Sequence, residues 1–274
     1  MSKALDEFSK PCMPKPSDLS PMSGCGVLAT RPQGFNTGLI QALSNLGAEV
    51  SELPLLSIVS CPMPTESMLS CEERIDGFIF TSRNAVEHAF AHWPELAQRI
   101  GTADFSAVGA GTAKALKAKG IAQVLIPKSE YNSEGLLDLA QFRQPTGQHL
   151  AVISGHGGRG LLVDTLRARG AQVTRLDVYK RVPVSTDVRG YLRQHLQNIQ
   201  MIVITSAEAL AVLVDPGTEQ DLEIVLGYPL VVASDRIARV AKTLGFSAQI
   251  EVAEQVTDKA LADACQQLWA QFQQ

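Results

Sequence analysis

The sequence predicts an α/β protein built from two flavodoxin-like domains, each with a doubly wound parallel sheet. Short apolar runs alternate with helical patterns along most of the chain, which is typical of βα units. Residues 78–80 are apolar at every position, and this pattern indicates a strand buried on both faces, as in a parallel sheet. Segments of the first half also recur in the second half at a nearly constant spacing, which predicts an internal duplication.

The duplication is clearest in two apolar runs that each end in Thr-Ser, residues 78–82 and residues 202–206. Their first positions lie 124 residues apart (202 − 78). Three other segments repeat at spacings of 123 to 125 residues, namely 33–50 with 156–173, 106–120 with 231–245, and 132–140 with 257–265. Chance similarity does not keep its register over four segments, so we expect two homologous domains.

Five βα units are expected in each half, in the order that a flavodoxin-like sheet needs. The first half is predicted to hold strands at 27–30, 49–56, 77–81, 105–108 and 123–126, and helices at 35–46, 65–74, 84–90, 112–118 and 133–142. The second half is predicted to hold strands at 150–153, 172–179, 201–205, 230–233 and 248–252, and helices at 160–169, 188–198, 208–214, 236–244 and 258–269. Gly47, Gly120, Gly170 and Gly245 each follow a helical pattern, and glycine commonly ends a helix in the left-handed conformation.

Composition excludes several classes of protein. The 274 residues, of which 45% are hydrophobic, suit two domains of ordinary size. No apolar run approaches the roughly 18–20 residues of a membrane span, and the start lacks a secretory signal pattern, so no membrane partner is expected. Five cysteines without Cys-x-x-Cys spacing predict reduced thiols in a cytoplasm. The net charge of −4 offers no broad basic face, so nucleic acid is not an expected partner. Residues 1–26 are proline-rich and aperiodic, which predicts a disordered N-terminal extension.

An anion-binding site is expected at the carboxyl ends of the strands, where ligands of open α/β sheets bind. The residues predicted there are small, hydroxylated or basic, and they precede helices whose free N–H groups attract anions. The candidates for substrate binding are Arg31, Thr81, Ser82, Arg83, Thr112, Ser154, Gly155, Gly157, Ser206 and Ser234. Helix capping alone is a competing explanation for the serine and threonine hydroxyls.

Two motifs have both a functional explanation and a simpler one. Residues 155–160 spell Gly-x-Gly-x-x-Gly after a strand, with Asp177 about 20 residues on, which is the dinucleotide-binding pattern. The repeat counterpart at 31–34 lacks these glycines, so the fold does not require a pyrophosphate there. His88 and His92 have the spacing of metal ligands on a helix, but no third ligand is nearby in the sequence. We therefore expect two surface histidines and no metal.

An ordered set of motifs spans about residues 27–265. It comprises Thr-Arg-Pro at 30–32, the segments 78–86 and 108–113, Gly-Gly-Arg at 157–159 followed by 166–173, and Leu-Asp-Val-Tyr-Lys-Arg at 176–181. This set resembles the uroporphyrinogen-III synthase family. Two segments depart from the family pattern. Ser154-Gly155 stands where Arg-Gly is more usual, and Ala-Ser-Asp-Arg at 233–236 replaces the usual residues there.

The resemblance implies a lyase of tetrapyrrole and haem biosynthesis that needs no cofactor. Such an enzyme takes hydroxymethylbilane, a linear tetrapyrrole polycarboxylate, and closes it to uroporphyrinogen III with inversion of ring D and loss of water. A cytoplasmic monomer is expected. The resemblance also implies that the chain crosses between domains after the second strand of each repeat. One domain would comprise 27–56 and 180–274 and the other 57–179, joined by a two-strand linker with the substrate cleft between them.

Tyr179 is the candidate catalytic residue on this interpretation, because the departing hydroxyl group needs a proton donor and no His, Cys or carboxylate is placed by a motif at the cleft. Two other classes of function stay open at this point. One is a bilobed protein that binds or senses small anions without chemistry, since fold does not fix function. The other is a nicotinamide-dependent oxidoreductase that uses the 155–160 loop.

Overall fold

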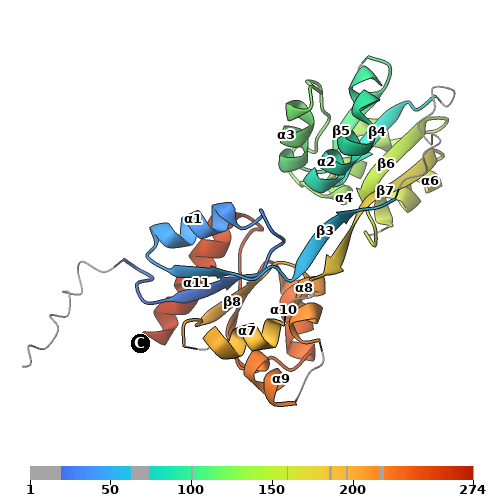
Figure 1. The fold of residues 1–274 in the computed structure, drawn as a ribbon. Coiled ribbons are helices and arrows are strands. Elements are labelled where there is room, and N and C mark those ends of the chain that lie inside the picture. Colours follow the sequence, from blue (N-terminus) through green and yellow to red (C-terminus); the bar gives the residue numbers. More distant parts are fainter. Residues whose placement is uncertain are drawn as a thin grey trace, which may run out of the picture. The chain divides into compact units, whose positions relative to one another are not determined.

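The computed structural model describes residues 20–62, 74–99, 101–158, 160–184, 187–195, 197–215 and 219–273. The chain forms two compact units. Unit 1 comprises Met1–Ser57 and Pro183–Gln274, and unit 2 comprises Ile58–Val182. Each unit has one five-stranded sheet covered by helices, so the predicted α/β fold with parallel sheets is confirmed (Figure 1).

The sheet of unit 1 is parallel throughout and has the order β10-β9-β8-β1-β2. Its strands are β1 (Gly26–Ala29), β2 (Glu49–Glu52), β8 (Met201–Ile204), β9 (Leu230–Val232) and β10 (Ile250–Val252). One face carries α1 (Thr37–Asn45) and α11 (Asp258–Phe272), which pack against each other. The other face carries α7 (Val188–His195), α8 (Ala207–Leu213), α9 (Glu219–Leu226) and α10 (Asp235–Thr243). Successive strand residues supply both cores: Val27 and Ala29 face α1 and α11, whereas Leu28 faces the opposite cluster.

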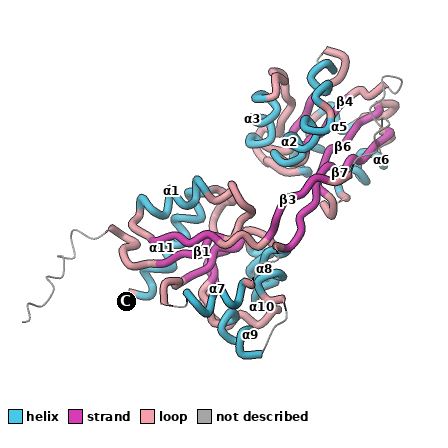
Figure 2. The backbone as a smooth tube through the Cα atoms, viewed as in Figure 1, coloured by secondary structure: helices cyan, strands magenta, loops and turns pink. Residues whose placement is uncertain are grey.

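The sheet of unit 2 has the order β3-β7-β6-β4-β5. Its strands are β3 (Leu56–Ser60), β4 (Gly77–Phe80), β5 (Asp104–Ala107), β6 (His149–Gly155) and β7 (Gln172–Pro183), drawn in magenta in Figure 2. Phe78 and Phe80 pack under α2 (Arg83–His92) and α3 (Ala110–Ala118). Ile79 points to the other face, which is covered by α4 (Ser133–Leu137), α5 (Ala140–Arg143) and α6 (Leu161–Ala168).

The edge strand β3 runs antiparallel to β7. The amide of Cys61 donates to the Val178 carbonyl, and the amide of Val184 donates to the Leu55 carbonyl, both at 3.1 Å. The residue numbers of these two pairs have the same sum, as an antiparallel ladder requires, and this register sets Ser60 opposite Tyr179. The other strand pairs of this sheet are parallel.

Local chemistry accounts for most element ends. Glycines follow α1, α3, α6 and α10 with φ between 89° and 94°, at the predicted positions Gly47, Gly120, Gly170 and Gly245. At the other end of α2, the Ser82 side chain accepts a hydrogen bond from the Ala85 amide at 3.1 Å. Such signals depend on a few neighbouring residues, which is why the sequence predicts them.

Two predicted elements are different in the structure. The expected helix at 133–142 is broken into α4 and α5 by the extended backbone of Leu139. Arg169 makes this break possible, because its Nη1 donates to the carbonyls of Leu137 at 2.6 Å and Phe142 at 2.7 Å. The expected strand at 123–126 is reduced to one bridge between Leu125 and Ser106, and Pro127 follows it without an N–H to extend the ladder.

Further differences concern shorter segments. The expected strand at 49–56 is two strands, β2 and β3, separated at 53–55, where Pro54 stands. Neither α9 nor the 3₁₀ helix η1 (Pro94–Arg99) was expected. The predicted helix at 65–74 falls almost entirely on residues 63–73, outside the described residues, as do positions 1–19 of the predicted disordered extension. Positions 20–26 do not fit that prediction: Met22 and Cys25 are fully buried in unit 1, because their side chains complete its apolar core.

Three cysteines within the described residues, Cys25, Cys61 and Cys265, are free thiols. Burial raises the pKa of the Cys25 thiol to about 12, and it raises the pKa of Cys265 as well. Both thiols therefore stay protonated, and they serve as small apolar core residues. No helix within the described ranges is long and apolar enough to cross a membrane.

Replacing Tyr228 by Phe is expected to raise the free energy of unfolding by about 1 kcal/mol, since a buried hydroxyl without a partner carries a desolvation cost of that order. Tyr228 is 7% exposed, and its hydroxyl has no hydrogen-bond partner among the described residues. Chemical denaturation of both proteins measures the difference. Tyr131→Phe is the matched control. Tyr131 is 56% exposed, so its replacement should leave the free energy of unfolding unchanged. A destabilised Tyr228→Phe protein would contradict the expectation.

Candidate active site at the carboxyl ends of β4 and β6

A small cavity of about 160 Å³ lies at the carboxyl edge of the unit 2 sheet. Five predicted site residues line it: Thr81, Ser82, Ser154, Gly155 and Tyr179. Its other lining residues are Ser133, Val152, His156, Gly158, Leu162, Val163, Arg175 and Arg181. The cavity therefore has the location that open α/β sheets favour for ligands, and its wall combines hydroxyl groups with basic side chains.

The end of β4 supplies the two hydroxyl residues. The amide of Thr81 continues the pairing with β6 by donating to the Ile153 carbonyl at 3.1 Å. The next residue, Ser82, leaves the strand and caps α2. Its Oγ accepts the Ala85 amide and lies 3.1 Å from the hydroxyl oxygen of Tyr179. One hydroxyl group therefore both begins the helix and contacts the candidate catalytic side chain.

Tyr179 enters this site from β7, 97 positions away from Ser82 in sequence. The pairing of β6 with β7 shifts register here, since Ser154 is opposite Asp177 whereas Gly155 is opposite Tyr179. The shift is a β-bulge, which re-aims the side chain that follows it. The Tyr179 side chain is buried, with 3% of the residue exposed, and the residue lines the cavity.

The ring of Tyr179, rather than a bound nucleotide, explains why residue 155 is a glycine. A Cβ atom at position 155 would lie 2.5 Å from Cζ of Tyr179, so no larger residue fits while the ring keeps its place. Gly157 has a φ of 77° in a turn, a left-handed conformation that favours glycine. A Cβ atom at Gly160 would meet the Asp164 side chain at 2.7 Å. The Tyr179 ring and the turn thus account for Gly155 and Gly157, whereas the Asp164 side chain could move to admit a larger residue at position 160.

A charged cluster adjoins Tyr179. The Ser154 hydroxyl donates to Oδ1 of Asp177 at 2.7 Å, and Nε of Arg175 donates to the same oxygen at 2.9 Å. Nδ1 of His156 lies 3.5 Å from the other carboxylate oxygen. Arg175, His156 and Arg181 are not among the site residues predicted from the sequence. A signal for two of them was present, because Arg175, Asp177, Tyr179 and Arg181 alternate along a strand.

The other predicted site residues of unit 2 do not line this cavity. Arg83 is exposed at the first position of α2, Thr112 is 6% exposed within α3, and Gly157 lies in the open turn after β6. The helix that begins at Arg83 also carries His88 and His92. The expectation of two surface histidines is correct for His92, which is exposed, but His88 is partly buried.

Unit 1 holds the remaining three predicted residues. Arg31 forms an ion pair with Asp258 and donates to the Phe35 carbonyl at 3.3 Å, so its guanidinium group already has an acidic partner. Ser206 caps α8 by accepting the Ala209 amide at 3.0 Å. Ser234 precedes α10 without a side-chain capping bond. Capping thus accounts for Ser206 but not for Ser234.

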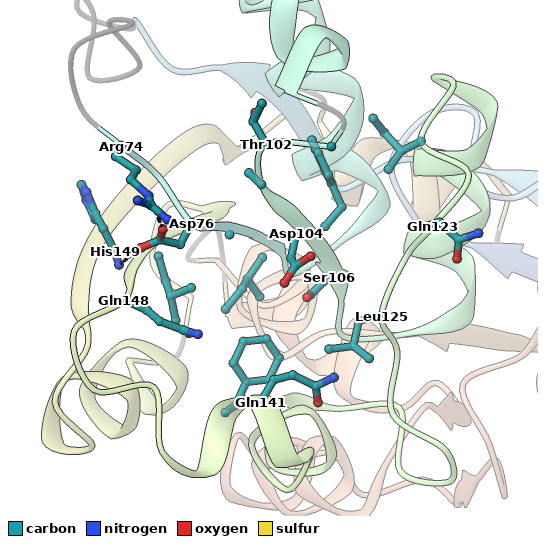
Figure 3. A pocket seen from close by; sticks show the side chains of 18 of the residues that line it. Arg74, Asp76, Thr102, Asp104, Ser106, Gln123, Leu125, Gln141, Gln148 and His149 are labelled. Carbon is teal, nitrogen blue, oxygen red and sulfur yellow. Dashed lines mark hydrogen bonds and ion pairs between the residues drawn. The ribbon is translucent and has the colours of Figure 1, made fainter.

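A larger cavity of about 1200 Å³ lies at the opposite edge of the unit 2 sheet, where β4, β5 and β6 begin. Figure 3 shows its polar lining, which includes Asp76, Asp104, Gln123, Gln148 and His149. Ligands of this fold class bind at the carboxyl edge, so size alone does not make this cavity the active site. Within the described residues no group of three or more His, Cys, Asp or Glu side chains could hold a metal ion.

Asp76 in this larger cavity gives a pH-dependent expectation. The backbone amide of His149 donates to its carboxylate at 2.9 Å and Arg74 pairs with it at 3.0 Å, and these contacts hold the pKa of Asp76 below its ordinary value. A lowered carboxyl pKa stabilises the fold above the unfolded value of about 4, and the stabilisation is lost as pH falls through the folded pKa. Asp76→Asn should therefore lower Tm at pH 7, by about 1–2 °C for a partly exposed group. Thermal unfolding at pH 3 should show a smaller difference, and an equal or larger one would contradict the assignment.

Comparisons with known proteins agree with one another. The family profile described as Uroporphyrinogen-III synthase HemD matches residues 38–263. The uroporphyrinogen-III synthase of Escherichia coli (strain K12) is 31% identical over 252 residues, which cover 88% of this chain and 99% of that protein.

Solved structures also match. A uroporphyrinogen-III synthetase from Helicobacter pylori has a TM-score of 0.60 at 13% identity and covers 89% of this chain and 99% of its own. A mutant uroporphyrinogen III synthase from the extremely thermophilic bacterium Thermus thermophilus has a TM-score of 0.55 at 18% identity, with coverage of 91% and 99%. At these identities the structural likeness supports the fold alone.

Proposed function

This chain belongs to the uroporphyrinogen-III synthase family, and on that premise we propose that it closes hydroxymethylbilane to uroporphyrinogen III with inversion of ring D and loss of water. The observation that carries the proposal is the family match over residues 38–263 together with the near full-length similarity to a named synthase. The protein is thus a cyclising lyase of porphyrin biosynthesis, and its substrate is a small molecule, the linear tetrapyrrole.

Tyr179 is proposed as the proton donor of the first step. The hydroxymethyl group of the substrate leaves as water once it is protonated, and the C–O bond breaks to give an azafulvene cation. The Ser82 hydroxyl, 3.1 Å from the phenol oxygen, is well placed to donate to the phenolate that remains. The Ala85 amide and the positive end of the α2 dipole strengthen this donor.

Ring D then attacks the cation through its substituted α-carbon to give a spiro intermediate. The older bond from that carbon to the methylene carbon of ring C breaks, and the methylene carbon bonds instead to the unsubstituted α-carbon of ring D, on the other side of the ring nitrogen. The ring carbon that forms the final bond loses a proton, so the reaction returns the proton that Tyr179 supplied. No net acid is consumed, and no redox partner is needed. The unassisted closure gives the symmetrical isomer I, so the enzyme's selectivity must come from positioning ring D.

Carboxylate arms of the substrate are the proposed ligands of the basic and hydroxyl side chains at the cavity. A cavity of about 160 Å³ is smaller than the roughly 300–1,000 Å³ of typical ligand pockets, so it would hold one arm or part of a ring. Arg175 and Arg181 are the proposed cationic partners there, and His156 is a proposed hydrogen-bond partner. The substrate-binding roles of Arg31, Thr81, Ser82, Arg83, Thr112, Ser154, Gly155, Gly157, Ser206 and Ser234 are part of the same proposal.

We further propose that the two compact units act as the two domains of a cytoplasmic monomer that requires no cofactor or metal. The other functional classes have less support. The Tyr179 ring accounts for Gly155 and the left-handed turn accounts for Gly157, so these two glycines give no separate reason for a nicotinamide cofactor. The family match favours an enzyme over a protein that only binds small anions.

The test is incubation with freshly generated hydroxymethylbilane, followed by chromatographic separation of uroporphyrinogen isomers I and III after oxidation. Isomer III is expected as the main product, at a rate well above the spontaneous closure. Isomer I alone, from folded protein, would overturn the proposal. A matched incubation with NAD or NADP in a thermal-shift assay should give no stabilisation, whereas a shift of several degrees would favour the oxidoreductase alternative.

A further inference from the structure

We propose that His88 is a positioning residue that holds the ring of Tyr179 in its productive orientation, an inference that rests on the function proposed above. His88 does not line the cavity and is not expected to contact substrate. Its effect on the reaction would therefore pass through the tyrosine.

The contact between the two rings is direct. The imidazole of His88 stacks on the phenol ring of Tyr179, with ring centroids 5.6 Å apart and an angle of 25° between the planes. This separation lies within the range in which aromatic pairs attract each other. Gly155 on β6 meets the same phenol ring, since its hydrogen occupies the place where a Cβ atom would clash with Cζ. Together, His88 and Gly155 restrict the ring at two places, and Ser82 holds its hydroxyl group.

His88 is itself held in place from β3. Its Nδ1 lies 2.8 Å from Oγ of Ser60, and the β3–β7 register sets Ser60 opposite Tyr179. The helix carrying His88 is capped by Ser82, six positions before His88, so the two groups that contact Tyr179 from this helix and its cap move as one rigid element. The tyrosine is therefore restrained from α2, β3 and β6 together, which a simple core packing position would not require.

Electrostatics favour an uncharged imidazole at this place. Burial, and next the positive charge on His92, lower the pKa of His88, whereas Glu87 acts in the opposite direction. Glu87 is partly neutralised by its ion pair with Lys119 of α3 at 2.8 Å. Two groups on other elements face the His88 ring, namely the Ser60 hydroxyl on β3 and the Tyr179 phenol on β7. A neutral stacked ring orients the phenol without adding a charge that would favour loss of its proton before substrate arrives.

The test compares four single variants by steady-state kinetics and isomer analysis. His88→Ala removes the stacked ring and is expected to lower kcat about tenfold with little change in KM, because the effect is on orientation rather than on substrate binding. His88→Phe restores a flat ring and should stay within about twofold of the wild-type kcat. Ser60→Ala removes the anchor and should give an intermediate loss. His195→Ala is the matched control and should not change kcat. It removes a stacked His–Tyr pair in α7, in which the ring centroids of His195 and Tyr191 lie 4.2 Å apart.

A double variant separates positioning from general loss of stability. If His88 acts only through the tyrosine hydroxyl, His88→Ala should lower kcat no further when Tyr179 is already Phe. Labelling the ring carbons of tyrosine gives a readout independent of activity, since the chain has only four tyrosines. The NMR resonance that disappears in Tyr179→Phe should shift in His88→Ala and stay in place in His195→Ala.

Each outcome decides the proposal. A wild-type kcat in His88→Ala, additive losses in the double variant, or an unmoved Tyr179 resonance would overturn it. A His88→Phe protein as impaired as His88→Ala would also overturn it, because a stacking role tolerates phenylalanine. If the wild-type protein forms no isomer III, the proposed function fails by itself, and the NMR comparison still tests whether His88 orients Tyr179.

Discussion

Tyr179→Phe is expected to lower kcat by about 10²-fold, near the lower end of the acceleration that a positioned acid provides. The substitution removes only the hydroxyl group that lies 3.1 Å from Ser82 Oγ and keeps the ring that stacks on His88. Folding and product affinity should therefore change little. The share of isomer I should rise, because bilane that leaves the enzyme closes without help. Isomer analysis alongside initial rates measures both effects.

Ser82→Ala serves as the companion variant for this result. It removes the hydroxyl that contacts the phenol, but the Ala85 amide and the α2 dipole remain, so a loss of only a few-fold in kcat is expected. The lost cap should cost about 1 kcal/mol of stability. If Tyr179→Phe turned over at the wild-type rate and made isomer III, Tyr179 would be a packing residue and the proton donor would lie elsewhere.

Gly155→Ala is expected to impair the enzyme although it replaces no proposed proton donor. The added methyl group would lie 2.5 Å from Cζ and 2.8 Å from the hydroxyl oxygen of Tyr179, so the ring must move. Displacing the phenol by about an ångström should lower kcat roughly 10- to 100-fold, because catalysis depends steeply on geometry. Overpacking of this kind also destabilises a fold by about 1–3 kcal/mol.

A second substitution tests whether the ring is the cause. In a Tyr179→Ala background the position next to residue 155 is open, so the stability cost of Gly155→Ala should largely disappear. Denaturant unfolding of the four proteins of this cycle gives the coupling free energy. An undiminished cost in the double variant would mean that the backbone of β6, and not the ring of Tyr179, excludes a side chain at Gly155.

Much of the fold follows from local sequence patterns. Apolar runs such as 78–80 indicated buried strands, and the glycines at 47, 120, 170 and 245 indicated helix ends, because both signals depend on a few adjacent residues. The family motifs also predicted the function. The internal duplication stays a prediction. Where local signals were absent, as at the break between α4 and α5, the expectation was wrong, because Arg169 stabilises that break from a distant part of the chain.

The arrangement of the site was decided by tertiary structure alone. Thr81 and Ser82 were expected at the end of a strand, and so was Tyr179, but their meeting depends on β6 lying between β4 and β7 and on the bulge opposite Gly155. The stacking of His88 on Tyr179 likewise brings together residues 91 positions apart (179 − 88). Hydrophobic periodicity specifies which face of a strand is buried, but strand order and register come from the packing of the whole sheet, which no short stretch of sequence encodes.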